Sequence, residues 1–123
     1  MLTRIRRHTV SFKHAIDGIC HNFKTQPNFR FHLLAMVSVI LAGIYFSLST
    51  IEWLVLIFTF NMVIVAEMVN TSIESMVDLI TQERREDAKI AKDVSAGMVL
   101  MSAFFSVCIG LFIFLPKLIT SIN

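Results

Sequence analysis

The most prominent pattern in the chain is a set of long apolar stretches without charge. Residues 33–51 and 94–115 form uncharged runs of 19 and 22 residues, and a helix needs roughly 20 apolar residues to cross a bilayer core. A third apolar stretch follows Glu52 and continues to Ile80, although acidic residues interrupt it. The pattern therefore predicts three transmembrane helices, over residues 31–49, 51–80 and 93–116.

The segment before the first apolar run has the pattern of an amphipathic surface helix. Large apolar residues recur there at i, i+4, i+7 and i+11, whereas the charged residues lie largely elsewhere on the helical wheel. These apolar positions are Phe12, Ile16, Ile19 and Phe23. A basic, aromatic helix suits the interface of an anionic membrane, and Pro27 ends it before the chain enters the bilayer. We predict this helix over residues 9–26.

The composition favours a membrane protein over a soluble domain. Of the 123 residues, 55% are hydrophobic and 16% charged, and the mean hydropathy is +0.71, whereas soluble domains carry about a quarter charged residues. Residues 1–32 hold six Lys or Arg and no apolar stretch long enough for a cleavable signal peptide. Cys20 and Cys108 lie in segments of different character, so we expect two free thiols. We predict one all-α domain over residues 1–123, without a nucleic-acid partner.

The basic residues predict the orientation of these helices. Ten of the eleven Lys and Arg residues precede the first span or lie between the second and third, and only Lys117 lies on the other side. Cytoplasmic loops carry an excess of Lys and Arg. We therefore expect the N-terminus and the 81–93 loop in the cytoplasm and the C-terminus outside the cell.

Four polar residues of the second span share one narrow face. Glu67, Asn70, Glu74 and Asp78 follow the spacing i, i+3, i+7 and i+11, which places them within about 80° of one another on the helical wheel. The 14 residues of 53–66 climb about 21 Å of a roughly 30 Å hydrocarbon core. Glu67 is therefore expected inside the bilayer near its cytoplasmic side, and Asp78 is expected to reach cytosolic water.

A carboxylate at this depth is costly unless it is paired, hydrated, protonated or bound to a cation, so Glu67 is a candidate functional residue. Carboxylate, water and phosphate oxygens are the ligands that Mg²⁺ prefers, and Glu67 can instead accept a proton from a substrate hydroxyl. Two non-enzymatic interpretations stay open. Asn70 and Thr71 can join helices in an oligomer, and the stripe can serve an ion pathway, although the outer halves of the spans are mostly apolar.

Lys92 and Asp93 open the third span, directly before the small residues 95–97, which permit close helix approach. Lys92 can reach a phosphate group, and its alternative is an ordinary interfacial lysine. The sequence contains no glycine-rich phosphate loop, so any nucleotide must be held by charge and metal. The four histidines do not form a metal-binding set, because three lie on the charged surface segment and one marks the entry of the first span: His8, His14, His21 and His32.

The segment AEMVNTSIESMVD, residues 66–78, resembles the signature Glu-x-x-Asn-x-x-Ile-Glu-x-x-x-Asp of the bacterial integral membrane diacylglycerol kinase family. The segment AKIAKD, residues 88–93, and the apolar third span follow it as in that family, and the resemblance extends from Ser11 onward. It is strongest to the Gram-positive members that act as undecaprenol kinases. The resemblance implies an ATP-dependent lipid kinase that forms a homotrimeric bundle in the bacterial inner or plasma membrane, with sites between adjacent subunits.

The resemblance also implies roles for individual residues. Glu67 is the expected catalytic base that deprotonates the lipid hydroxyl, and Glu74 is the expected Mg²⁺ ligand. Nucleotide binding is assigned to Asn70, Glu74, Asp78, Lys92 and Asp93. Lipid binding is assigned to Glu67, Asn70 and Arg30. The expected co-substrate and metal are ATP and Mg²⁺.

The segment TQPNFRFH, residues 25–32, departs from the family at one position. It resembles a Glu-x-Asn-x-Arg-x-His stretch in which Gln26 replaces a glutamate that joins the metal site in the family. A neutral oxygen or a water can replace that carboxylate only partly. The expected lipid is undecaprenol, with undecaprenyl phosphate as product. The alternative is diacylglycerol, which would give phosphatidic acid, because both lipids present a hydroxyl at the interface.

Overall fold

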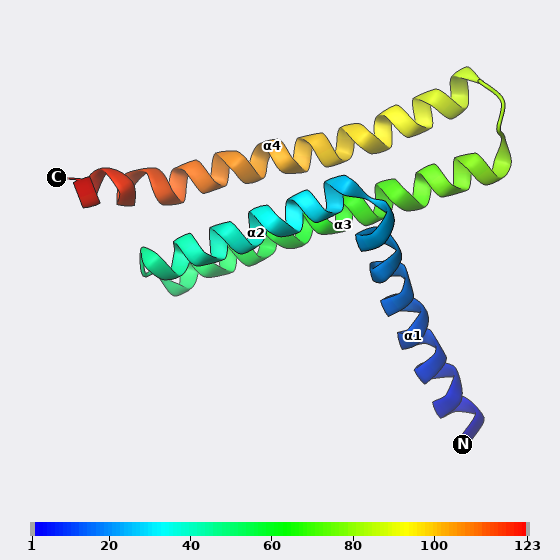
Figure 1. Cartoon of the computed structure of the whole chain (residues 1–123), viewed down its shortest axis with the longest axis horizontal. Helices are drawn as coiled ribbons and strands as arrows, with labels where there is room; N and C mark the ends of the chain where they lie inside the picture. The colour runs from blue at the N-terminus through cyan, green and yellow to red at the C-terminus, as the bar shows by residue number, and fades with distance from the viewer. Residues whose placement is uncertain (1, 123) are drawn as a thin grey trace.

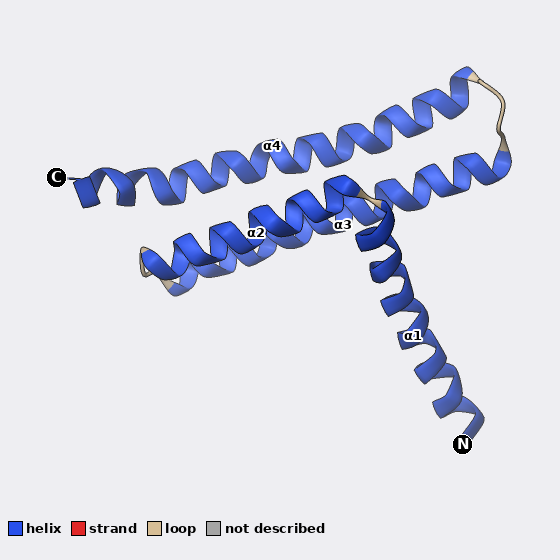
Figure 2. Cartoon of the chain, in the orientation of Figure 1, coloured by secondary structure: helices blue, strands red, loops and turns tan. Residues whose placement is uncertain are grey.

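The computed structural model describes residues 2–122, with side chains from residue 11 onward, and this part of the chain is almost entirely helical (Figures 1 and 2). Its helices are α1 (Leu2–Thr25), α2 (Pro27–Tyr45), α3 (Thr50–Ile80) and α4 (Glu86–Ile122). Three of them, α2, α3 and α4, are long and apolar enough to cross a membrane. The predicted fold class is confirmed: the chain is an all-α, multi-pass membrane protein.

The central element is α3, which contacts each of the other helices. Figure 1 shows α4 running alongside α3, whereas α1 leaves the start of α2 at a steep angle. Within residues 2–122 the backbones of α2 and α4 do not approach each other closely, so they flank α3 without forming a closed bundle. Most large apolar side chains of the three spans are exposed, as expected for surfaces that face lipid.

The joint between α1 and α2 is a single residue, Gln26. Its backbone N–H donates to the Asn22 carbonyl at 2.9 Å. Pro27 is the first residue of α2, where its missing N–H costs nothing and its fixed φ suits a helix. The Arg30 Nη1 group donates to the carbonyls of Phe23 and Lys24 at 2.9 and 3.0 Å, which satisfies the last turn of α1. Because Pro27 starts α2, this helix begins before the residue 31 predicted for the first span.

The turn between α2 and α3 explains why α2 ends at Tyr45 and not at residue 49. Ser47 has a φ of 50°, in the left-handed region. The N–H groups of Ser47 and Leu48 donate to the carbonyls of Ile44 and Gly43 at 3.2 and 3.1 Å. These two bonds form a Schellman motif, which ends a helix. The turn lies inside the uncharged run of residues 33–51, so the charge pattern gave no sign of this end.

Ser49 caps α3. Its side chain accepts the N–H of Glu52 at 3.3 Å, and Glu52 Oε2 accepts the N–H of Ser49 at 2.7 Å, which completes a capping box. Beside this cap, α2 and α3 approach closely at Gly43. A Cβ atom built there would lie 2.7 Å from Trp53 Cη2.

The ends of α4 extend beyond the predicted span of 93–116. Its first turn carries Glu86 and Asp87, whose negative charges interact favourably with the positive end of the helix dipole. At the other end, the helix continues past Pro116 to Ile122. Near that second end, Lys117 Nζ lies 3.0 Å from Glu52 Oε1, so an ion pair joins α4 to the first turn of α3.

The buried residues of α3 lie along one face: Leu56, Thr59, Val63, Ala66, Glu67 and Thr71. This face is mostly apolar in its first part, toward the α2–α3 turn, and polar in its second part, toward the α3–α4 loop. The name hairpin end is used below for residues 43–53 together with Lys117, and the name loop end for residues 67–95.

Candidate active site at the loop end of α3

Glu67 lies more than three turns before the end of α3 and is only 2% exposed. His32 on α2 is its nearest charged or chargeable neighbour, with Nε2 at 3.2 Å from Oε1. This contact lacks the alignment of a hydrogen bond, so Oε1 has no hydrogen-bond donor among the described side chains. A buried acceptor without a donor is costly, and it leaves this oxygen available to a hydroxyl from outside the chain.

Asn70 connects the next carboxylate of the stripe to α4. Its Nδ2 group donates to Glu74 Oε1 at 3.2 Å, and its Oδ1 accepts the hydroxyl of Ser95 at 2.7 Å. The Ser95 Oγ atom also lies 2.9 Å from the Lys92 carbonyl oxygen. Ser95 lies on α4, is 2% exposed and bonds to Asn70 on α3. It therefore holds the Asn70 amide in place, and that amide orients the carboxylate of Glu74.

The stripe ends in an ion pair across the mouth of the α3–α4 loop. Lys92 Nζ lies 2.6 Å from Asp78 Oδ1, and both side chains are partly exposed. They line an open concavity of about 710 Å³ between the end of α3 and the start of α4. The neighbouring charged residues of its lining are Glu83, Arg84, Arg85, Glu86 and Lys89. Asp93 is not part of this pair and instead lies 3.8 Å from Lys89, with both side chains largely exposed.

Residues 13–114 match the family model for the prokaryotic diacylglycerol kinases. The chain belongs to the prokaryotic diacylglycerol kinase family. It is 43% identical over 114 residues to the undecaprenol kinase of Bacillus subtilis, a match that covers 93% of both chains. It is also 43% identical over 112 residues to the diacylglycerol kinase of Synechocystis, covering 90% of this chain and 64% of that one. The diacylglycerol kinase of Haemophilus influenzae is 28% identical over 99 residues, which is 80% of each chain.

This membership confirms the family resemblance and places the protein among lipid kinases, which use ATP as co-substrate. The two non-enzymatic interpretations of the acidic stripe are therefore not retained. The comparisons name no functional residues, so the roles assigned to individual side chains remain predictions.

Two of the residues assigned to the site of this kinase lie at the α1–α2 joint. The Gln26 side-chain amide donates to Thr25 Oγ1 at 3.4 Å, and the Nη1 group of Arg30 is held by the carbonyls of α1. Within residues 11–122 of one chain, neither side chain forms a hydrogen bond or ion pair with Glu67 or Glu74. Their predicted roles in metal and lipid binding thus have no support from contacts within this part of the chain.

The carboxylates of the kinase suit a metal ion that arrives with the nucleotide. Among the described residues no three His, Cys, Asp or Glu side chains lie close enough to hold an ion by themselves. Mg²⁺ in phosphoryl-transfer enzymes is held by one or two carboxylates together with substrate phosphates. Glu74, whose carboxylate is oriented by Asn70 and lies between the buried Glu67 and the concavity, fits this type of site.

Sequence reasoning missed the positions of two residues of the kinase. His32 was interpreted as the entry of the first span, and Ser95 as a small residue that permits helix approach. The structure places His32 beside Glu67 and Ser95 beside Asn70. A polar residue at a similar depth on a neighbouring span is the signal that could have indicated both contacts.

Proposed function

We propose that the protein transfers the γ-phosphoryl group of ATP to the hydroxyl of undecaprenol, with Glu67 as the general base. The observation that carries the proposal is the buried Glu67 Oε1 atom, which has no hydrogen-bond donor among the described side chains. A general base must have an acceptor free to reach the proton that it removes. The depth of Glu67 suits a lipid hydroxyl, which stays attached to a chain in the bilayer.

The choice of lipid is supported by the comparisons. The relative named undecaprenol kinase matches 93% of this chain and is itself matched over 93% of its length. The relative named diacylglycerol kinase at the same identity is matched over 64% of its length. Diacylglycerol is the second candidate, because both relatives with 43% identity support a lipid hydroxyl as acceptor.

The nucleotide is proposed to bind at the loop end, with Asn70, Glu74, Asp78, Lys92 and Asp93 as its contacts. Bound with ATP, Mg²⁺ neutralises negative charge on the phosphoryl group. Glu74 is positioned by Asn70 to hold that ion. Lys92 lies at the mouth of the concavity and presents a cation to phosphate oxygens. Arg30 is proposed to contact the lipid from the α1–α2 joint.

Gln26 is proposed to give a weaker metal contact than the glutamate of the family resemblance, because an amide oxygen carries no net charge. The Gln26→Glu variant is therefore expected to reach half-maximal rate at a lower Mg²⁺ concentration.

The site is proposed to face the cytoplasm of a bacterial cell and to lie between adjacent subunits of a homotrimer. The distribution of Lys and Arg supports an N-terminus inside and a C-terminus outside. The homotrimer, with its site between adjacent subunits, is what the resemblance of residues 66–78 to the family signature implies.

The proposal is tested by phosphate transfer from labelled ATP, with Mg²⁺, in mixed micelles that contain undecaprenol or diacylglycerol at equal mole fraction. We expect labelled undecaprenyl phosphate, formed several-fold faster than labelled phosphatidic acid. Faster transfer to diacylglycerol would overturn the choice of lipid and leave the chemistry in place. Transfer to neither lipid, by wild type or by Gln26→Glu, would overturn the proposed function.

A further inference from the structure

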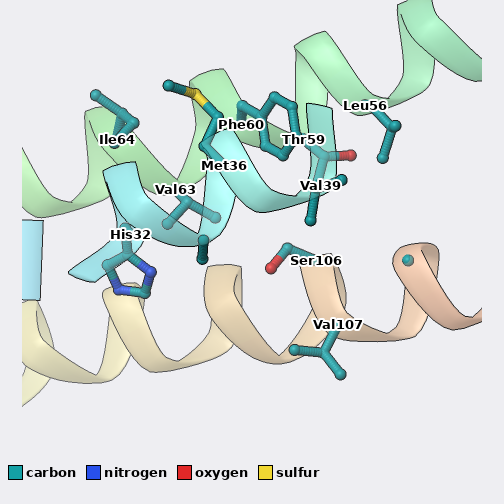
Figure 3. A pocket seen from close by; sticks show the side chains of 12 residues that line it. His32, Met36, Val39, Leu56, Thr59, Phe60, Val63, Ile64, Ser106 and Val107 are labelled. Atoms are coloured by element: carbon teal, nitrogen blue, oxygen red, sulfur yellow. The ribbon is translucent and has the colours of Figure 1, made fainter. Parts of the chain in front are cut away.

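The three spans line a partly open cavity of about 170 Å³ on the apolar part of the buried face of α3 (Figure 3). Leu56, Thr59 and Val63 of α3 form its floor. Its walls come from α2 and α4, whose backbones do not approach each other closely. Figure 3 shows His32 and Leu56 at opposite ends of the lining residues, with Ser106 of α4 on the side that faces α3.

The walls of this cavity suit a hydrocarbon and not water. The hydroxyl of Thr59 donates to the Val55 carbonyl at 2.7 Å, and that of Ser106 donates to the Ala103 carbonyl at 2.8 Å. Both donors are therefore used within their own helices. A buried water needs two to four polar partners, whereas a dry apolar cavity of about 150 Å³ holds a six-carbon ring. The volume thus matches a short, branched hydrocarbon unit.

The cavity and the candidate active site share one residue, His32. His32 lines one end of the cavity and also lies 3.2 Å from the Glu67 carboxylate. The floor residues Thr59 and Val63 precede Glu67 at helical spacing and are buried on the same face of α3. At 1.5 Å per residue, Val63 and Glu67 are separated by about 6 Å along the helix. The cavity therefore lies within reach of a hydrocarbon chain whose hydroxyl is at Glu67.

We propose that this cavity holds the hydroxyl-proximal isoprene units of the lipid alcohol, and that Gly110 determines its width. The inference rests on the proposed function and adds the part of the site that selects the lipid. The hydrocarbon chain of the lipid moves from the bilayer core into an apolar cavity, so its burial there contributes little transfer free energy. Its effect is to position the hydroxyl and to select the shape of the chain next to it.

Gly110 and Gly97 provide a matched pair for the test. A Cβ atom at either glycine would have no neighbour within 4 Å, so a larger side chain starts without a clash at both. Gly110 lines the cavity and Gly97 does not. Kinetics of the full-length Gly110→Leu and Gly97→Leu proteins are measured in mixed micelles with undecaprenol and ATP.

We expect Gly110→Leu to lower kcat/KM for undecaprenol about ten-fold, the size of effect that one or two methylene groups have in a hydrophobic pocket. The KM for ATP should stay within two-fold of wild type, and Gly97→Leu should keep its kcat/KM for undecaprenol. An unchanged kcat/KM in Gly110→Leu, or an equal loss in Gly97→Leu, would overturn the proposal.

A second variant keeps the test informative if Gly110→Leu does not fold. Ser106→Leu fills the same cavity from the turn of α4 that precedes Gly110. It removes a hydroxyl that bonds only within its own helix. The same ten-fold loss is expected. If either variant changes its oligomeric mass but keeps the wild-type kinetics for undecaprenol, the cavity is occupied by a side chain of a neighbouring subunit. That result would overturn the proposal. A wild-type protein that phosphorylates no lipid would instead overturn the proposed function.

Discussion

Two glutamates of α3, Glu52 in its first turn and Glu67 near its middle, have opposite environments. Glu52 at the hairpin end uses both carboxylate oxygens, because Oε2 accepts the Ser49 N–H at 2.7 Å and Oε1 pairs with Lys117 at 3.0 Å. Glu67 at the loop end is almost fully buried, and its Oε1 has no hydrogen-bond donor among the described side chains. The satisfied carboxylate stabilises the fold, whereas the unsatisfied one, which lowers stability, is the candidate for chemistry.

The two lysine–carboxylate pairs that join α3 to α4 differ in the same sense. Lys117 pairs with Glu52, whose carboxylate also completes the capping box at Ser49, so both partners are fixed within the structure. Lys92 pairs with Asp78 beside an open concavity, where a charged ligand can enter and exchange partners with either side chain. The hairpin end therefore holds the spans together, and the loop end is available to bind.

Loss of the proposed metal ligand at the loop end should have a large effect on the rate. Glu74→Gln is expected to slow phosphate transfer about 100-fold, because it removes negative charge where the cation is proposed to bind. Part of the rate should return as the Mg²⁺ concentration is raised. The rate is measured against Mg²⁺ concentration, with Glu52→Gln as control. A Mg²⁺ dependence identical to that of wild type would contradict this role.

A substitution at the hairpin end should instead change stability. Gly43→Ala places a Cβ atom 2.7 Å from Trp53 Cη2 and 2.9 Å from Leu48 Cδ1, and overpacking of this kind costs about 1 to 3 kcal/mol. We expect the free energy of unfolding in SDS-containing micelles to fall by that amount, while the folded fraction stays active. Gly110→Ala, with open space around its Cβ, is the control. Equal stability of the two variants would show that the close approach at Gly43 is not required.

The smallest expected effect is the difference in stability between variants of the two glutamates. Glu67→Gln should raise the free energy of unfolding by about 1 kcal/mol, because a buried amide costs less than a buried carboxylate without a donor. Glu52→Ala should lower the stability, because it breaks the capping box and removes the partner of Lys117. Unfolding in SDS measures both. Two changes of the same sign would remove the distinction between these environments.

Helical periodicity and charge were sufficient to predict the three spans and the shared face of Glu67, Asn70, Glu74 and Asp78, because both depend on spacing along one helix. The position of Glu67 inside the bilayer stays a prediction.

Contacts between helices could not be predicted in this way. His32 and Ser95 meet Glu67 and Asn70 through the relative position of neighbouring helices, which the periodicity of each helix does not specify. The end of α2 was missed because Ser47 adopts a left-handed conformation in an uncharged turn that has no glycine at this position. The early start of α2 follows from Pro27, which both ends one helix and begins the next.

The most direct test of the role of Glu67 is phosphate transfer to undecaprenol by Glu67→Gln, with Glu52→Gln as the matched variant of the same helix. A glutamine at residue 52 can still complete a capping box, so this variant should keep its rate within about two-fold. Removal of a general base is expected to cost between about 10² and 10⁴ in rate. We predict a loss of that size in Glu67→Gln, with KM values for ATP and lipid close to those of wild type. A Glu67→Gln protein that transfers phosphate at the wild-type rate would contradict the assignment of Glu67 as the base.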